Sequence, residues 1–276
     1  MGKPNYLMQY SGNKSQFADK IISLFPERTK YECYAEPFMG ALGLFLNKPK
    51  YVNQVEIVND LNGDMTNLFW VLQNKYKEFV AYFKFAHISS DLYKIIRAKQ
   101  RFETNKIKRA FNYLYLIQMS HNGQGSSFAQ HSTKCPASLK TVLSRAEFVN
   151  ERLKDTIIEN KDWKKIIKQY DSDKTLFYLD PPYCGTSVSG YAKGCGYIDF
   201  DDFVETIKAI KGFAVISHSK FDKLAQVFNE HKVYEKSITY ISASVNKATG
   251  RDDYDLGKMS RDEYVYTNYK LQGKLF

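Results

Sequence analysis

Short apolar runs alternate with amphipathic stretches in the first part of the chain. Residues 32–36 and 54–58 have the composition of strands, and residues 41–46 and 65–73 have the apolar spacing of helices. A strand–helix–strand–helix order is typical of a parallel sheet that helices cover. The pattern therefore predicts an α/β fold for this part of the chain.

The same alternation returns in the last third of the chain. Residues 176–179 form an apolar strand run that ends in a Pro-rich turn, residues 200–211 have helical spacing, and residues 213–217 are again strand-like. Further on, residues 236–242 and 263–269 alternate as strands do. The charged, Gly-containing stretch between them, 246–258, is predicted to be a loop.

The middle of the chain has a different composition, with helical stretches rich in Lys, Arg, Tyr and Phe. Residues 121–127, HNGQGSS, indicate a loop or a hairpin turn. We interpret residues 84–170 as an inserted, largely helical domain. The flanking residues, 1–83 and 171–276, are interpreted as one domain with a mostly parallel sheet.

A chain of 276 residues with 43% hydrophobic content can bury a full core. Residues 1–9 lack an apolar signal region, and no apolar run is long enough for a membrane span, so we expect an intracellular, cytoplasmic protein. The four cysteines contain no C-x-x-C pair, which argues against a zinc site. Free thiols are expected at Cys33, Cys135, Cys184 and Cys195.

The formal net charge of +10 indicates a polyanionic partner. Residues 84–170 hold 17 Lys and Arg against 7 Asp and Glu, so the surplus there is 17 − 7 = 10 and accounts for the whole net charge. A solvated helical face would explain the same run, because charge alone does not identify nucleic acid.

The tetrapeptide Asp180-Pro181-Pro182-Tyr183 follows the apolar run 176–179 directly. Ligands of open α/β sheets bind at the carboxyl ends of the strands, where this motif would lie. The two prolines remove two backbone donors, so carbonyl groups around them can face a cavity. An ordinary Pro turn with a solvated Asp is the alternative interpretation.

The chemistry of this tetrapeptide suits an exocyclic amine, whose lone pair is delocalised into its ring. A carboxylate and a carbonyl can together hold both amino hydrogens and favour a pyramidal nitrogen, ready to attack a methyl group. The Tyr183 ring offers a face on which a flipped-out base can stack.

Two other segments are candidates for cofactor contact. Pro37-Phe38-Met39-Gly40 would form a tight turn after the first strand, and Asp60 at the tip of the second strand could accept hydrogen bonds from ribose hydroxyls. A buried Phe and an Asp that caps a helix are the competing interpretations.

These segments together resemble the Dam-type, D12-class adenine-N6 DNA methyltransferases. The resemblance includes Tyr10 to Lys14, Glu36 to Gly40, Asn59 to Asn62, Asp180 to Tyr183, Val215 to Ser219 and Glu263 to Asn268, in the order of the family. It implies a Rossmann-like fold, S-adenosyl-L-methionine as cofactor, double-stranded DNA as partner and neither a metal nor a membrane. A cognate restriction endonuclease acting on the same site is a candidate second partner.

The resemblance also implies roles for individual residues. The catalytic set would be Asp180, Pro181, Pro182 and Tyr183, and the set that contacts the cofactor would be Tyr10, Lys14, Glu36, Phe38, Gly40, Asp60 and Asp180. The resemblance leaves the insertion poorly matched, so its roles are assigned from residue type. Base edges would be read by His121, Asn122, Gln124 and Gln130, and phosphates would be held by Lys99, Arg101, Lys106, Lys108 and Arg109. A polar loop and a solvated helix are the alternatives for these two sets, and core packing is favoured over base stacking for Tyr113, Tyr115 and Leu116.

Two departures from the family pattern stand out. Leu42 occupies a position where the family often has a second glycine, and the glycine comes one residue later, at Gly43. The segment Gly125-Ser126-Ser127-Phe128-Ala129-Gln130 differs from the hairpin associated with GATC methylation, so the target sequence is expected to differ.

Three rival functions are compatible with the cofactor motifs. An enzyme that methylates RNA adenine or a protein glutamine would use the same cofactor, but the glutamine enzymes and several of the RNA enzymes usually carry Asn where Asp180 stands. A non-catalytic DNA-binding protein with a decayed methyltransferase fold would not need Asp180, Asp60 and Lys14 to be intact. The sequence therefore favours methylation of DNA adenine at N6.

Overall fold

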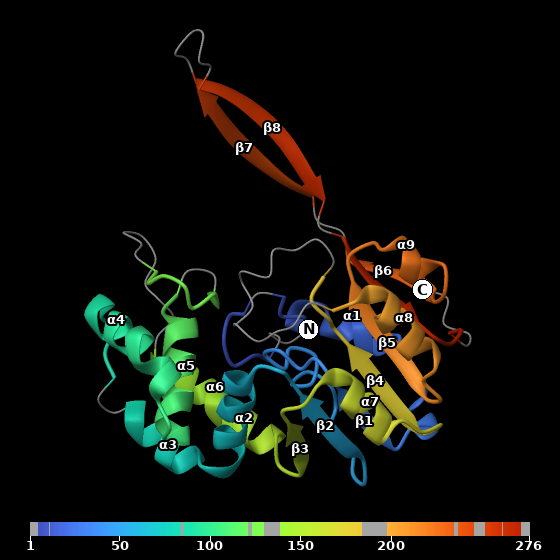
Figure 1. Cartoon of the computed structure of the whole chain (residues 1–276), viewed down its shortest axis with the longest axis horizontal. Coiled ribbons are helices and arrows are strands. Elements are labelled where there is room, and N and C mark those ends of the chain that lie inside the picture. The colour runs from blue at the N-terminus through green and yellow to red at the C-terminus, as the bar shows by residue number, and fades with distance from the viewer. Residues whose placement is uncertain are drawn as a thin grey trace.

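The computed structural model describes residues 5–10, 12–83, 86–120, 123–129, 139–183, 198–234, 237–245, 252–260 and 262–271. A sheet of seven strands lies at its centre, in the order β3-β2-β1-β4-β5-β9-β6 (Figure 1). The strands are β1 Cys33–Glu36, β2 Val55–Asn59, β3 Thr156–Glu159, β4 Thr175–Leu179, β5 Phe213–His218, β6 Asn229–Tyr234 and β9 Glu263–Thr267.

The neighbours from β3 to β5 are parallel, whereas β9 runs antiparallel to both β5 and β6. The sheet is therefore mostly parallel, and the expected Rossmann-like α/β fold is confirmed. The helices are α1 Ala18–Ser23, α2 Gly63–Asn74, α3 Tyr76–Phe83, α4 Ser90–Lys99, α5 Lys106–Gln118, α6 Leu139–Arg152, α7 Trp163–Tyr170, α8 Phe200–Lys208 and α9 Asp222–Ala225. Three 3-10 turns lie at Ser15–Phe17, Arg28–Lys30 and Gln100–Phe102.

Side chains of each strand alternate between two apolar layers, as the twofold period of a strand requires. In β4, Phe177 and Leu179 enter a cluster formed with α7, α8 and α9, while Leu176 and Tyr178 enter a second cluster on the other face. The second cluster includes α1, α2, α5 and α6. All five residues of β4 are buried, which explains its unbroken apolar sequence.

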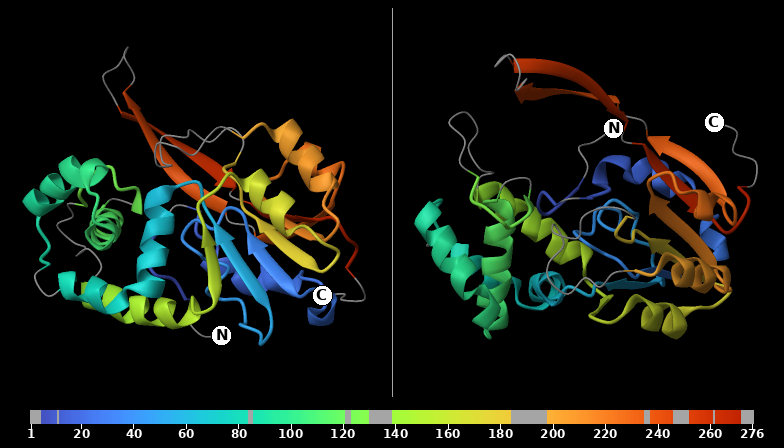
Figure 2. Two further views of the ribbon diagram at one scale, coloured as in Figure 1. Left: turned by 60° about the horizontal axis from the view of Figure 1, so that its bottom comes forward. Right: turned by 45° about the horizontal axis from the view of Figure 1, so that its top comes forward.

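Helices α3 to α6 form a helical unit beside the sheet, next to the edge that β3 occupies (Figures 1 and 2). Helix α5 packs against α2, α3 and α4, and α6 packs against α2 and α3. Side-chain N-caps begin α4, at Ser89, and α5, at Asn105. The Asn105 side chain accepts from the amides of Ile107 and Lys108, both at 3.0 Å, at the start of α5.

Strand β3 and helix α7 fall inside segment 84–170, which the sequence assigned to an insertion. Residues Glu56 to Asn59 of β2 pair with Thr156 to Glu159 of β3, so this part of the segment extends the sheet. Ile167 of α7 packs into the layer of α8. The helical unit thus ends at Arg152, before the sheet resumes.

The prediction of a helix over residues 41–46 is wrong. These residues form a series of turns, with an isolated hydrogen bond from the Leu46 amide to the Leu42 carbonyl. Leu42 has a φ of 58°, in the left-handed region, which a right-handed helix does not allow. The apolar residues of this segment are nevertheless buried, as in a helix.

The prediction of a loop over residues 246–258 is wrong for its second half. Strand β8, Asp252–Ser260, pairs antiparallel with β7, Ser237–Val245, from Ser237↔Ser260 to Val245↔Asp252. The two strands form a separate ribbon that projects from the sheet, on the side toward which the arrows of β2 and β4 point (Figure 1). Backbone pairing between two strands tolerates charged residues, and residues 246–251 lie outside the described part of the chain.

Candidate active site

Three parallel strands, β1, β2 and β4, deliver the site residues to one edge of the sheet. Glu36 ends β1, Asn59-Asp60 ends β2 and Asp180 follows β4. The Asn59 side chain donates to the Pro37 carbonyl at 2.9 Å, and the backbone carbonyl of Asn59 accepts from the Met39 amide at 2.8 Å. The turn after β1 is thereby fixed against the end of β2.

Asp180 forms an ion pair with Lys14, which comes from the N-terminal motif. The Lys14 ammonium lies 2.9 Å from Oδ1 and 3.0 Å from Oδ2 of Asp180, and it also donates to the Gly12 carbonyl at 3.1 Å. Burial raises the pKa of the Asp180 carboxyl, while the charge and hydrogen bond of Lys14 and the Tyr183 hydroxyl lower it. The Asp180 carboxylate is therefore a desolvated hydrogen-bond acceptor, and the Lys14 ammonium favours its charged form.

Tyr183 lies between Glu263 and His218. Its hydroxyl donates a short hydrogen bond to Glu263 Oε1, and its ring stacks on the His218 imidazole with centroids 4.5 Å apart and planes at 29°. The Lys14 ammonium is 4.9 Å from the centroid of the Tyr183 ring. The hydroxyl and the ring of Tyr183 are thus each held by a residue distant in sequence.

His218 and Glu263 were not among the predicted site residues, since the sequence placed both in structural strands. Burial lowers the pKa of His218 to about 4, so the ring is neutral near pH 7. A signal was nevertheless present, because each is a polar residue at the end of an apolar strand. His218 ends β5 and Glu263 begins β9.

The Asp60 carboxylate joins the loops that follow β1 and β2. Its Oδ2 accepts from the Gly40 amide at 3.0 Å, and its Oδ1 accepts from the Asn62 amide at 2.8 Å. Gly40 has a φ of 46°, and a Cβ built on it would lie 3.9 Å from the Tyr10 ring. Tyr10, Gly40 and Asp60 therefore lie close together.

Helix α5 of the helical unit reaches the same place. The Tyr113 hydroxyl accepts from the Asn62 side chain at 3.4 Å. A Cβ built on Gly123, after α5, would lie 2.2 Å from the Gln9 carbonyl oxygen, so this backbone rests on the N-terminal segment. Tyr113 is 7% exposed, in agreement with the core-packing interpretation, and its hydroxyl points toward the Asp60 loop.

The glycine that departs from the family pattern is explained by close packing. A Cβ on Gly43 would lie 2.1 Å from Asn13 Oδ1 and 2.8 Å from the Lys14 amide nitrogen. Leu42, one residue earlier, takes the left-handed φ of 58° and is fully buried. Leu42 thus adopts the left-handed backbone conformation. Position 43 has no room for a side chain and requires glycine.

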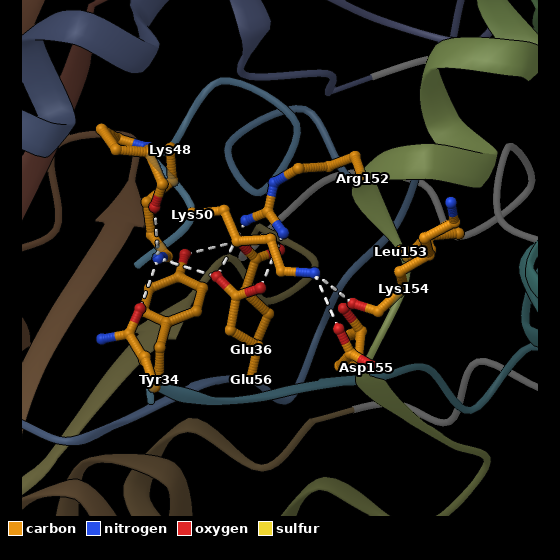
Figure 3. A network of polar contacts seen from close by, with 12 residues as sticks. Tyr34, Glu36, Lys48, Lys50, Glu56, Arg152, Leu153, Lys154 and Asp155 are labelled. Carbon is orange, nitrogen blue, oxygen red and sulfur yellow. Dashed lines mark hydrogen bonds and ion pairs between the residues drawn. The ribbon is translucent and has the colours of Figure 1, made fainter. Parts of the chain in front are cut away.

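Glu36 belongs to a buried polar network, drawn in Figure 3. The Tyr34 hydroxyl donates to Glu36 Oε1 at 2.5 Å, and burial raises the pKa of Glu36 to about 8. Beside it, Glu56 binds Arg152 through both oxygens, at 2.6 and 2.8 Å, and the Lys48 ammonium at 2.9 Å (Figure 3). Arg152 ends α6, so the network attaches the helical unit to the sheet behind the cofactor motif.

Phe38 lies half-buried on the opposite layer. Its ring is 5.8 Å from the Trp163 ring of α7 and 6.3 Å from the Phe203 ring of α8, centroid to centroid. The predicted site residues that the structure brings together are therefore Tyr10, Lys14, Gly40, Asp60, Asp180 and Tyr183. Glu36 instead faces the buried network, and Phe38 faces the aromatic side chains of α7 and α8.

The five basic residues predicted to hold phosphates differ in their surroundings. The Arg109 Nε lies 2.5 Å from Asp64 Oδ1, and the Lys108 ammonium lies 2.8 Å from Glu103 Oε2. The Lys106 ammonium lies 4.4 Å from the centroid of the Trp70 ring on α2. Lys99 and Arg101 are exposed and form no ion pair with any described residue.

Of the four residues predicted to read base edges, Gln124 is exposed. His121, Asn122 and Gln130 lie outside the described residues. Ser120 and Phe128 form an antiparallel bridge, which agrees with the hairpin turn predicted for residues 121–127. Cys33 is a free thiol, and the other three cysteines lie outside the described residues.

The described residues contain neither a candidate metal site nor a candidate membrane span. Among the described residues, no group of three or more His, Cys, Asp or Glu side chains is arranged to hold a metal ion. Within the same part of the chain, no helix has both the length and the apolar character needed to cross a membrane.

Comparison with known proteins adds independent information. The chain is 26% identical over 200 residues to the DNA adenine methylase of Haemophilus influenzae, an alignment that covers 67% of each chain. It is 24% identical over 199 residues to the DNA adenine methylase of Escherichia coli K12, with 68% of each chain covered, and 28% identical over 127 residues to that of Serratia marcescens, with 45% covered.

The family model of the D12 class N6 adenine-specific DNA methyltransferases matches residues 10–241, which include the N-terminal motif, the ends of β1 and β2, the helical unit and the tetrapeptide after β4. Tyr10, Lys14, Asp60, Asp180 and Tyr183 all fall within this range. The chain therefore belongs to the D12 class of N6 adenine-specific DNA methyltransferases.

Proposed function

We propose that this chain transfers a methyl group from S-adenosyl-L-methionine to the N6 amino group of adenine in duplex DNA. The observation that carries the proposal is the position of Asp180, desolvated at the end of β4, with the Lys14 ammonium 2.9 Å from one of its oxygens. Family membership supports the same reaction.

The residues at the ends of β1 and β2 fit S-adenosyl-L-methionine. Asp60 uses its two oxygens on the Gly40 and Asn62 amides, and a carboxylate has further lone pairs that can accept ribose hydroxyls. Gly40 leaves its backbone open beside the Tyr10 ring, against which an adenine ring can pack. When bound, the cofactor supplies an electrophilic methyl group.

Asp180 acts on the target amine. Its carboxylate lies at the strand end, where it accepts a hydrogen bond from one N–H of the amine. It also stabilises the positive charge that develops on nitrogen. The prolines that follow leave carbonyl oxygens without competing backbone donors, so the second amino hydrogen can be held by a carbonyl. The charge and hydrogen bond of Lys14 favour the ionised carboxylate in a site where burial opposes ionisation.

Tyr183 provides the stacking platform for an extruded adenine. His218 already supports the ring at 4.5 Å, so a flipped base would extend an existing stack. Because the His218 ring is neutral near pH 7, it supports Tyr183 by packing and adds no charge beside Lys14.

The helical unit α3 to α6 is proposed to hold DNA. Lys99 and Arg101 are the first candidates for phosphate contact, because Lys108 and Arg109 are in ion pairs and Lys106 lies over the Trp70 ring of α2. The Arg101 guanidinium lies 4.5 Å from the ring centroid of its exposed neighbour Phe102. Base edges would be read from the segment after α5, by His121, Asn122, Gln124 and Gln130. A restriction endonuclease that shares the target would recognise the same sequence.

The test is methylation of mixed-sequence duplex DNA with labelled S-adenosyl-L-methionine, followed by digestion and identification of the methylated nucleoside. N6-methyladenine is the expected product, and mapping the modified adenines defines the target sequence. Methylcytosine as the product, or labelled RNA or protein in place of labelled DNA, would overturn the choice of substrate.

A further inference from the structure

Glu263 occupies a position that links the antiparallel part of the sheet to the catalytic tetrapeptide. It is the first residue of β9, and its neighbour Tyr264 pairs with His218 at the end of β5. This register places Glu263 beside the end of β5, next to the ring pair formed by His218 and Tyr183. Its side chain is only 13% exposed.

The Glu263 carboxylate contacts two groups that also surround Asp180. It accepts the short hydrogen bond from the Tyr183 hydroxyl, and its Oε1 lies 3.6 Å from the Lys14 ammonium. Lys14 is closer to Asp180, at 2.9 Å. One ammonium therefore lies between two largely buried carboxylates, nearer to the catalytic one.

Two carboxylates held close together in a desolvated site destabilise the folded protein. Burial raises the pKa of Glu263, and the nearby Asp180 charge raises it further, while Lys14 and the Tyr183 hydroxyl lower it. Two like charges in a desolvated site repel, and an aliphatic side chain at 263 would avoid that repulsion. The carboxylate at 263 is thus explained by its hydrogen bond with Tyr183 and its attraction for the Lys14 ammonium.

Two consequences for the reaction follow. A Tyr ring that is free at its hydroxyl end can rotate and tilt, whereas a charged acceptor fixes the plane on which the adenine stacks. A target amine that donates to Asp180 competes with Lys14 for the same oxygens. A second carboxylate 3.6 Å away keeps the ammonium at the site while this exchange takes place.

We propose that Glu263 is a positioning residue of the methylation site, which fixes the Tyr183 ring through its hydroxyl and holds the Lys14 ammonium between two carboxylates. The inference rests on the proposed function, because it assigns Glu263 to the reaction at Asp180. Glu263 touches neither the target base nor the methyl donor in this account.

The test is a double-mutant cycle between Glu263→Ala and Tyr183→Phe, measured as single-turnover methylation at the mapped adenine with the full-length chain. Glu263→Ala is expected to slow methyl transfer roughly tenfold or more, the effect of losing a charge-assisted hydrogen bond, with DNA and cofactor dissociation constants within about twofold of wild type. In the Tyr183→Phe background the same substitution is expected to slow transfer much less.

Glu263→Gln separates charge from geometry, since it keeps an acceptor for the Tyr183 hydroxyl and preserves the side-chain shape. It should be intermediate, faster than Glu263→Ala and slower than wild type. The matched control is Asp262→Asn, which removes the adjacent carboxylate, 3.2 Å from the Lys232 ammonium, and should leave the methylation rate unchanged.

Three results would overturn the inference. These are a Glu263→Gln rate equal to wild type, effects of Glu263→Ala and Tyr183→Phe that multiply independently, and a rate loss that is fully explained by weaker cofactor or DNA binding. Failure of the wild-type chain to methylate adenine would instead reject the proposed function, so the two failures are distinguishable.

Discussion

The Lys14 ammonium lies 3.0 Å from Oδ2 of Asp180, across 166 positions of the chain. This ion pair connects the N-terminal motif to the tetrapeptide Asp180-Pro181-Pro182-Tyr183, and the Lys14 charge lowers the pKa of a carboxyl that burial raises. The cofactor motif and the catalytic motif are therefore parts of one electrostatic unit, and the predictions below test its members separately.

Asp180→Ala should abolish methylation while DNA binding persists, because the proposed phosphate contacts lie in the helical unit. Asp180→Asn keeps one acceptor but loses the charge and can present a donor to the amine, so it should also be severely impaired. Single-turnover methylation and a DNA-binding assay measure both properties. A near wild-type rate for Asp180→Ala would contradict the mechanism.

Asp60→Ala should weaken binding of S-adenosyl-L-methionine by about 1–3 kcal/mol, the cost of losing charged hydrogen bonds. Both the ribose contacts and the anchoring of the Gly40 and Asn62 amides are removed. Isothermal titration calorimetry gives the affinity. Asp155→Ala, at a carboxylate whose side chain is 91% exposed, serves as the control, and equal affinities for the two variants would remove the assignment.

Gly43→Ala should impair cofactor binding and methylation, because the added Cβ would meet Asn13 Oδ1 at 2.1 Å and the backbone nitrogen of Lys14 at 2.8 Å. The collision displaces the segment that carries Lys14. Gly63→Ala is the matched control, since the nearest atoms to its Cβ are at 3.5 and 3.7 Å. Wild-type activity of Gly43→Ala would show that the N-terminal segment can move without loss.

DNA affinity should fall steeply with salt, and each lost phosphate contact should reduce the slope of log affinity against log salt by about 0.9. Lys99→Ala with Arg101→Ala should flatten the slope more, per charge removed, than the triple substitution of Lys106, Lys108 and Arg109. The latter three already contact Trp70, Glu103 and Asp64. The reverse ranking would place the phosphate-binding face on the first turn of α5.

His218 should make the folded protein less stable in acid. Its pKa is lowered to about 4 from 6.5, so between these values the unfolded chain binds a proton that the folded chain does not, and stability falls as the pH decreases. His218→Gln should lose this dependence, worth about 3 kcal/mol in total. Urea denaturation of both proteins at several pH values measures it, and parallel stability curves would contradict the prediction.

Much of the fold and of the candidate site follows from local sequence. The buried strand β4 is read from its unbroken apolar run, the helical character of the middle segment from the spacing of Tyr113, Tyr115 and Leu116, and the positions of Asp60 and Asp180 from the rule that strand ends carry ligands. Each of these features depends on neighbouring residues in the chain. The strand prediction for β9 was correct for the same reason, although its partner strands were not predicted.

The tertiary structure alone decided which distant groups meet. Glu263 reaches Tyr183 because β9 enters the sheet antiparallel between β5 and β6, a pairing that local periodicity does not encode. The basic residues at the start of α5 looked equivalent in sequence, but packing against α2 gave Arg109 an acidic partner. Leu42 took a left-handed conformation because the packing of its neighbours outweighs its own preference. Composition and periodicity report local energies, whereas ion pairs, stacking and backbone strain depend on contacts that form only when the chain has folded.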